Sequence, residues 1–142
     1  MKFVAAVESG LHQWVTFSGR ASRSEYWYFT LFYVVMMLLV HVANRSLKVL
    51  GPATKGSLPL LLLGIVASLI IIACIVWLFC AAISVLVRRL HDVNHSGWWY
   101  WISLTGIGAI FPLLVWSCRK GTAGMNDYGA DPLQHDHESA SA

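Results

Sequence analysis

Three long apolar stretches alternate with polar segments along the chain. The first covers about residues 27–43, the second 58–87 and the third 98–118, and none of them contains Asp, Glu, Lys or Arg. A helix needs about 20 apolar residues to cross the hydrocarbon core of a bilayer. The pattern therefore predicts three helical segments in a membrane domain over 19–133, with spans at about 27–43, 60–87 and 98–118.

The N-terminal segment has a different pattern. Apolar residues recur at helical spacing among polar ones over residues 1–18: Phe3, Val7, Leu11, Trp14 and Val15. Such a segment is too short and too polar to span a bilayer, which favours an amphipathic helix lying at the membrane interface. The alternative is a frayed terminus.

The polar segments carry turn and cap residues. Gly19 permits a turn, and Ser22 with Glu25 has the spacing of a capping box that starts the first long helix. Glycine, proline and asparagine predict a loop over 44–59, and a second loop is expected over 88–97. Residues 119–133 are rich in turn residues, and we expect 134–142 to be a disordered tail.

The third apolar stretch contains two glycines and a proline between Gly106 and Pro112, which should kink or break a helix. If it crosses the membrane, five basic residues lie on each side: Lys2, Arg20, Arg23, Arg88 and Arg89 against Arg45, Lys48, Lys55, Arg119 and Lys120. If it doubles back, the count becomes seven against three, and the positive-inside rule places both termini in the cytoplasm. The sequence is therefore compatible with a kinked crossing and with a re-entrant segment.

Composition supports a membrane protein. The chain is 57% hydrophobic and 12% charged, its mean hydropathy is +0.61, and it has seven tryptophans. A soluble surface needs about 25–35% charged residues, and tryptophan favours the headgroup level. The net charge of +3 is scattered, which argues against a nucleic-acid partner. We predict an all-α integral membrane protein.

Three ordered polar motifs resemble those of a known family. They are Phe17–Trp27, then Arg88–Asp92 running to Ser96–Trp99, then the glycine, asparagine, tyrosine and aspartate positions of 121–132. In this order the chain resembles the domain of unknown function 805 family, the YhaH-like bacterial inner membrane proteins, although Ala123 and Ala130 stand where that family usually has proline. The resemblance implies a small multi-pass protein of the bacterial inner membrane and brings no established activity.

Metal chemistry is the sharpest alternative for the central polar segment. His91 and His95 are four residues apart with Asp92 between them, so on a helix both could face one metal ion. A turn at Asn94 and Gly97 argues against that geometry, and a second histidine-rich group at 135–138 lies outside the motifs. No nucleophile motif or phosphate-binding glycine loop is present. We therefore expect neither a catalytic residue, a metal nor a cofactor.

Charged residues of the three motifs would meet at one membrane surface in the re-entrant arrangement. The predicted polar platform consists of Arg20, Arg23, Glu25, Arg88, Arg89, His91, Asp92, Asn126 and Asp131. We expect a non-enzymatic structural or accessory protein whose cytoplasmic face docks a protein or an anionic lipid. Its expected partners are the lipid bilayer, another membrane protein or further copies of itself. The alternative is a small oligomeric channel or transport component.

Overall fold

The computed structural model describes residues 1–50, 57–105 and 107–133, and only the backbone of 47–50 and 103–111 within these ranges. Its elements follow in the order α1 (Phe3–His12), α2 (Arg23–Leu50), α3 (Leu58–Asp92), η2 (Gly97–Thr105) and α4 (Ile107–Cys118). All are α-helices except η2, which is a 3₁₀ helix. The chain is therefore helical, as predicted, over the described residues.

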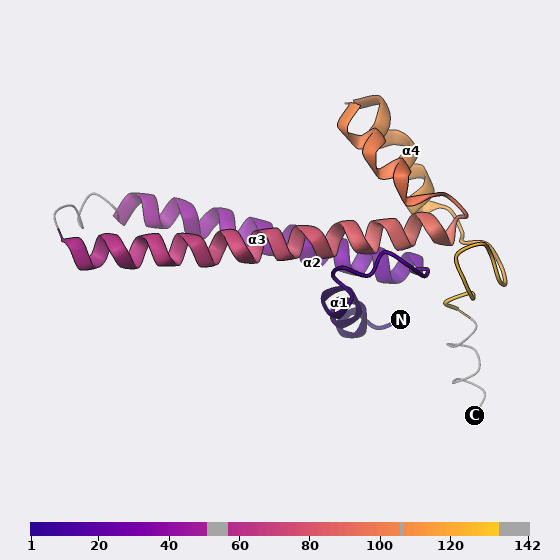
Figure 1. Ribbon diagram of the computed structural model, residues 1–142, viewed down its shortest axis with the longest axis horizontal. Coiled ribbons are helices and arrows are strands. Elements are labelled where there is room, and N and C mark those ends of the chain that lie inside the picture. The colour runs from indigo at the N-terminus through magenta and orange to yellow at the C-terminus, as the bar shows by residue number, and fades with distance from the viewer. Residues whose placement is uncertain (51–56, 106, 134–142) are drawn as a thin grey trace.

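Helices α2 and α3 form a long antiparallel pair, with the other elements gathered at one end of it (Figure 1). By length and composition, the segments Arg23–Ser46 and Leu58–Asp92 could each cross a membrane. The 35 residues of α3 extend about 52 Å, well beyond a hydrocarbon core of about 30 Å. Apolar side chains such as Leu38, Leu63 and Leu69 are exposed along the pair, as lipid-facing positions would be.

The helices are longer than the predicted spans. Helix α2 continues to Leu50, so the prediction of a loop over all of 44–59 was wrong. Residues 44–50 contain neither glycine nor proline, and polar side chains at a helix end do not break the helix. At the other end of the pair, α3 continues to Asp92, so the prediction of a loop over 88–97 was wrong for 88–92, and Arg88 and Arg89 are helical.

The predicted N-terminal helix is present as α1, which is shorter than the segment 1–18. Its small residues Ala6 and Gly10 are buried, and a Cβ added at Gly10 would lie 2.2 Å from the ring of Phe29 on α2. Phe29 also belongs to a small core with Ala81 and Val85 of α3. Gly10 thus allows α1 to pack closely against α2 near one end of the long helical pair.

The third apolar stretch reverses direction. Trp99 of η2 and Trp116 of α4 have ring centroids 5.3 Å apart, and His95, just before η2, lies 4.2 Å from the same ring. Both ends of the stretch therefore lie at the C-terminal end of α3 (Figure 1). Helix η2 ends at Thr105 and α4 begins at Ile107, while Pro112 lies within α4. Gly106 lies outside the described residues.

Candidate functional site

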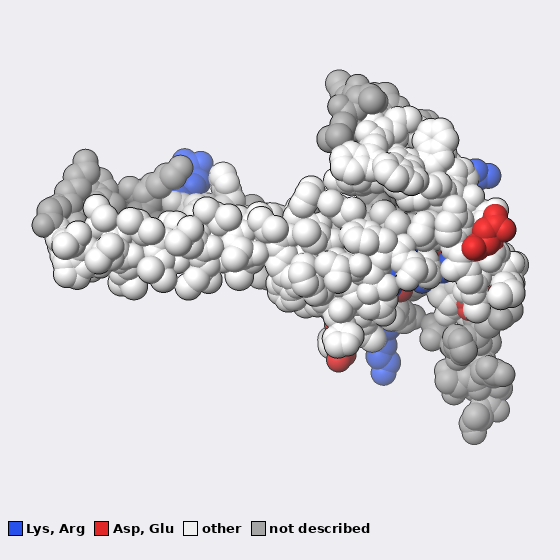
Figure 2. All heavy atoms as spheres, viewed as in Figure 1, with Lys and Arg blue, Asp and Glu red and all other residues white. Residues whose placement is uncertain are grey.

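Charged side chains gather at the end of the molecule where α1, the reversal and the tail meet, whereas the long helical pair is almost entirely uncharged in this view (Figure 2). Five of them are buried, with the following exposed fractions: Arg20 8%, Glu25 5%, Arg88 3%, Arg89 0% and Asp92 3%. We call these five residues the buried polar cluster. Charged residues are almost never buried unless they are paired, so their partners define the site.

Asp92, the last residue of α3, lies between two arginines. Its Oδ1 accepts a hydrogen bond from Nε of Arg20 at 3.0 Å and lies 2.9 Å from Nη2 of the same residue. Its Oδ2 accepts a hydrogen bond from Nη1 of Arg89, one turn earlier on α3. The carboxylate therefore joins the loop before α2 to the end of α3.

Arg20 extends this connection to the tail. Its Nη1 donates to the carbonyl oxygens of Gly124 at 2.6 Å and Gly129 at 3.2 Å, and its Nη2 donates to that of Thr122. A planar guanidinium with five N–H donors can satisfy a carboxylate and several carbonyls together, which an ammonium group cannot do in the same geometry. Arg20 thus holds the tail turn against α3.

Arg89 binds the C-terminal end of α4. Its Nε donates to the carbonyl of Ser117 at 3.3 Å, and its Nη2 donates to the carbonyls of Trp116, at 3.5 Å, and Arg119. The last carbonyls of a helix have no partner within that helix, and a cation near them interacts favourably with the helix dipole. Arg89 therefore supplies the cap that keeps α4 beside α3.

A second ion pair links α2 and α3. Nη1 of Arg88 lies 3.2 Å from Oε1 of Glu25 and donates to Oε1 of Gln13 at 2.7 Å. The same Glu25 oxygen accepts from the hydroxyl of Ser9 at 2.9 Å, which brings α1 into the network. Ser22 caps α2 as predicted, since its Oγ accepts from the backbone N–H of Glu25 at 3.3 Å.

The tail packs on the end of α3 through backbone and side-chain contacts. The N–H of Thr122 donates to the carbonyl of Asp92 at 2.8 Å, and the amide of Asn126 donates to that of His91 at 2.9 Å. The rings of His91 and Tyr128 stack at 3.9 Å with only 5° between their planes. A Cβ added at Gly121 would lie 2.1 Å from Oδ2 of Asp92, so only glycine fits there.

The loop before α2, the C-terminal end of α3 and the tail meet in the buried polar cluster. These segments correspond to the three polar motifs of the sequence. A family model described as "Protein of unknown function (DUF805)" matches residues 14–130. The chain belongs to the DUF805 family. It is 32% identical to inner membrane protein YhaI of Escherichia coli strain K12 over 124 residues, which cover 87% of this chain and 92% of that protein.

Two further relatives are also similar to most of this chain. Inner membrane protein YhaH of the same strain is 32% identical over 123 residues, covering 86% of this chain and 91% of that protein. The uncharacterized protein YiiR is 27% identical over 148 residues, covering 85% of this chain and 89% of that protein. No solved structure was found that matches the chain. The DUF805 chain is thus an inner membrane protein with two candidate spanning helices.

The structure of this DUF805 chain brings most of the predicted platform together. Arg20, Glu25, Arg88, Arg89 and Asp92 form the buried polar cluster, and His91 and Asn126 contact the tail beside it. Arg23 is exposed, and Asp131 accepts hydrogen bonds from the N–H groups of Gly124 and Leu133 within the tail turn. The cluster is interior, however, because the loop before α2 and the tail cover it.

The histidine pair does not converge. Asp92 faces two arginines, His91 stacks on Tyr128, and Nδ1 of His95 lies 2.7 Å from the carbonyl of Val93. No group of three metal-ligating side chains occurs among the described residues, and the histidine-rich group at 135–138 lies outside them. The contributions of Ser9, Gln13 and Gly121 were not predicted, because their sequence context shows nothing of the partners that folding brings to them.

Proposed function

We propose that the protein is a non-enzymatic accessory protein of the inner membrane, whose cytoplasmic end is a rigid block that docks a partner protein or anionic lipid. One observation carries this proposal: the charged side chains of the cluster bind one another and backbone carbonyls from separate segments. Groups engaged in this way hold segments together and are not free to act on a substrate. Breaking such buried pairs is strongly unfavourable, so the block resists opening.

The arrangement in the membrane follows from the reversal of the third apolar stretch. Helices α2 and α3 cross the bilayer, while η2 and α4 enter and leave on one side. Helix α4 has 12 residues, about 18 Å, which is too short to cross. Because both ends of this stretch lie at the end of α3, seven basic residues share one side against three on the other, which orients that end toward the cytoplasm.

The proposed docking face is the outer face of the tail, and four basic residues at the same end of the molecule form what we call the basic rim. Lys2, Arg23, Arg119 and Lys120 are all exposed on elements that meet at this end. Basic side chains at a cytoplasmic surface are attracted to anionic headgroups by about 1 kcal/mol each. With α1 lying along the interface, the rim would hold the block at the leaflet while the outer face of the tail stays open to a partner.

Crosslinking in native membranes tests this function. A photoreactive amino acid at Asp127, an exposed tail position, should capture one reproducible protein or phospholipid. Changing Arg23, Arg119 and Lys120 together to glutamine should reduce that capture several-fold. The matched control is Arg45→Gln, an exposed arginine near the other end of α2, which should leave capture unchanged.

The alternative function, an oligomeric channel, makes a separate prediction. Purified protein in liposomes should then carry ions in proportion to its amount, and crosslinks should join copies of the chain. Selective ion flux together with capture only of other copies would overturn the docking proposal.

A further inference from the structure

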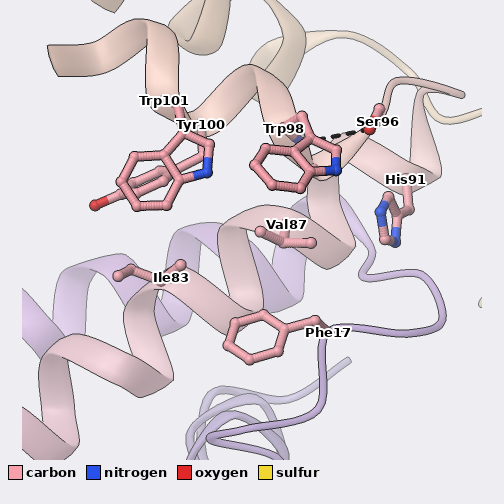
Figure 3. Close-up of a pocket in the computed structure, with 9 residues that line it drawn as sticks. Phe17, Ile83, Val87, His91, Ser96, Trp98, Tyr100 and Trp101 are labelled. Carbon is pink, nitrogen blue, oxygen red and sulfur yellow. Dashed lines mark hydrogen bonds between the residues drawn. The ribbon is translucent and has the colours of Figure 1, made fainter.

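A pocket of about 530 Å³ opens between η2 and the last turns of α3 (Figure 3). Its apolar walls come from the aromatic side chains of η2 on one side and from α3 and the loop before α2 on the other: Trp98, Tyr100, Trp101, Ile83, Val87 and Phe17. Ligand pockets typically enclose about 300–1,000 Å³ and combine apolar walls with a few placed polar groups. Two such groups, His91 and Ser96, lie at one end of the pocket, in addition to the Tyr100 hydroxyl and the indole N–H groups of the tryptophans.

The ring of His91 is held in one orientation at the end of the pocket. The side chain stacks on Tyr128, the residue is only 9% exposed, and Nδ1 lies 3.2 Å from the carbonyl of Gly19. A carbonyl oxygen can only accept, so Nδ1 carries the hydrogen in this contact. In the neutral ring Nε2 is then an acceptor. Burial of the ring favours its neutral form.

Nε2 of His91 faces the pocket without a partner among the described residues. A Cβ placed on Gly97, another lining residue, would lie 3.5 Å from this nitrogen, so Nε2 is beside the pocket wall (Figure 3). Close by, Oγ of Ser96 accepts from the N–H of Trp98 at 3.3 Å, which leaves its own hydroxyl hydrogen free to donate. The polar end of the pocket therefore offers one acceptor and one donor.

The residues that line the pocket indicate which kind of ligand it can bind. None of the nine lining residues is Lys, Arg, Asp or Glu, so a charged headgroup would not be neutralised there. The protein lies in the inner membrane, where lipids supply the apolar molecules, and tryptophan and tyrosine favour the headgroup level. An uncharged lipid with a hydroxyl next to an ester carbonyl matches both polar groups, and diacylglycerol has this chemistry.

We propose that this pocket binds diacylglycerol, with its hydroxyl donating to Nε2 of His91 and an ester carbonyl accepting from Ser96. One acyl chain lies between the aromatic side chains of η2 and the face of α3 formed by Ile83 and Val87. None of the nine lining residues belongs to the basic rim, so this site is independent of the proposed docking face. A failure of one proposal therefore leaves the other standing.

Binding can be measured with the full chain in phosphatidylcholine nanodiscs. The probe is a diacylglycerol with brominated acyl chains, which quenches nearby tryptophans such as Trp98 and Trp101. Its matched control is the same lipid acetylated at the hydroxyl, which keeps the chains and the esters but lacks the donor. We expect the hydroxyl form to bind three- to tenfold more tightly, as expected for about one neutral hydrogen bond. Equal quenching by both lipids would overturn the proposal.

Variants locate the site on the protein. His91→Asn keeps an amide N–H for the carbonyl of Gly19, but its shorter side chain has no acceptor at the position of Nε2, so it should erase the preference for the hydroxyl form. Ile83→Phe fills part of the pocket without adding a tryptophan, so it should reduce the quenching of Trp98 and Trp101 by either lipid. His95→Asn is the control, since His95 packs on Trp116 outside the lining. Binding that survives Ile83→Phe with its affinity and its hydroxyl preference intact would refute the assignment.

Discussion

Asp92→Asn is the most informative single change in the buried polar cluster. Asparagine has nearly the same shape as aspartate, so packing is preserved while the negative charge is lost. Its amide oxygen can still accept from one of the two arginines, but its NH₂ group must face donors of the other. Because Arg20 and Arg89 are both buried, one guanidinium loses its carboxylate partner without gaining water.

The expected cost is large compared with the stability of a domain. Removing one partner of a buried ion pair typically costs about 3–5 kcal/mol, because the remaining charge is left uncompensated. Domains are commonly stable by about 5–15 kcal/mol, so this change should remove a substantial share of the unfolding free energy. We expect the loss to reach the tail first, since Arg20 also holds Gly124 and Gly129.

Two measurements check this prediction. Reversible unfolding of the protein in bicelles by added SDS, followed by tryptophan fluorescence, gives the change in unfolding free energy. Trypsin cleavage after Arg119 and Lys120 reports local release of the tail and should become faster in the variant. Asp127→Asn, an exposed carboxylate on the same tail, is the matched control and should change stability by less than about 0.5 kcal/mol. A cost below about 1 kcal/mol for Asp92→Asn would refute the idea that this ion pair holds the segments.

Two further predictions test the same end of the molecule. Gly121→Ala places a methyl group 2.1 Å from an oxygen of Asp92 and should cost about 1–3 kcal/mol by the same unfolding assay, whereas Gly64→Ala, with nothing within 4 Å, should be neutral or slightly stabilising. In a cysteine-free background, a cysteine at Leu133 should react with impermeant maleimide from the cytoplasmic side and one at Ser57 from the other. Labelling of both from one side would contradict the proposed topology.

Helix content could be predicted because it depends on local properties of the chain. The apolar stretches are long enough to impose helices on a chain in a bilayer, where backbone groups must be satisfied internally. The cap at Ser22 depends only on a residue three positions away, and it is present. The loop predicted over 44–59 was too long. Polar composition shows where a helix is able to end, but the helix can continue through such residues, as α2 does to Leu50.

The buried polar cluster could be predicted only as a set of residue types. The distribution of charged residues along the sequence predicted that the arginines and carboxylates would share one end of the molecule. It did not predict that Asp92 would contact Arg20, 72 positions away. The capping of α4 by Arg89 is also invisible in the sequence, because it joins a side chain to backbone carbonyls, which every residue has. Such contacts depend on the direction in which the chain continues after the break. The glycine and proline pattern of the third stretch indicates a break but does not decide between a crossing and a reversal.

The sequence by itself determined that this is a helical inner membrane protein of the DUF805 family, because hydrophobic length and motif order are properties of the linear chain. Only the tertiary structure decided that the third apolar stretch turns back, that its end is held by Arg89, and that the charged residues lie inside. The physical reason is burial: a charge loses its water only when several segments close around it. Which partners compensate it then depends on how those segments pack.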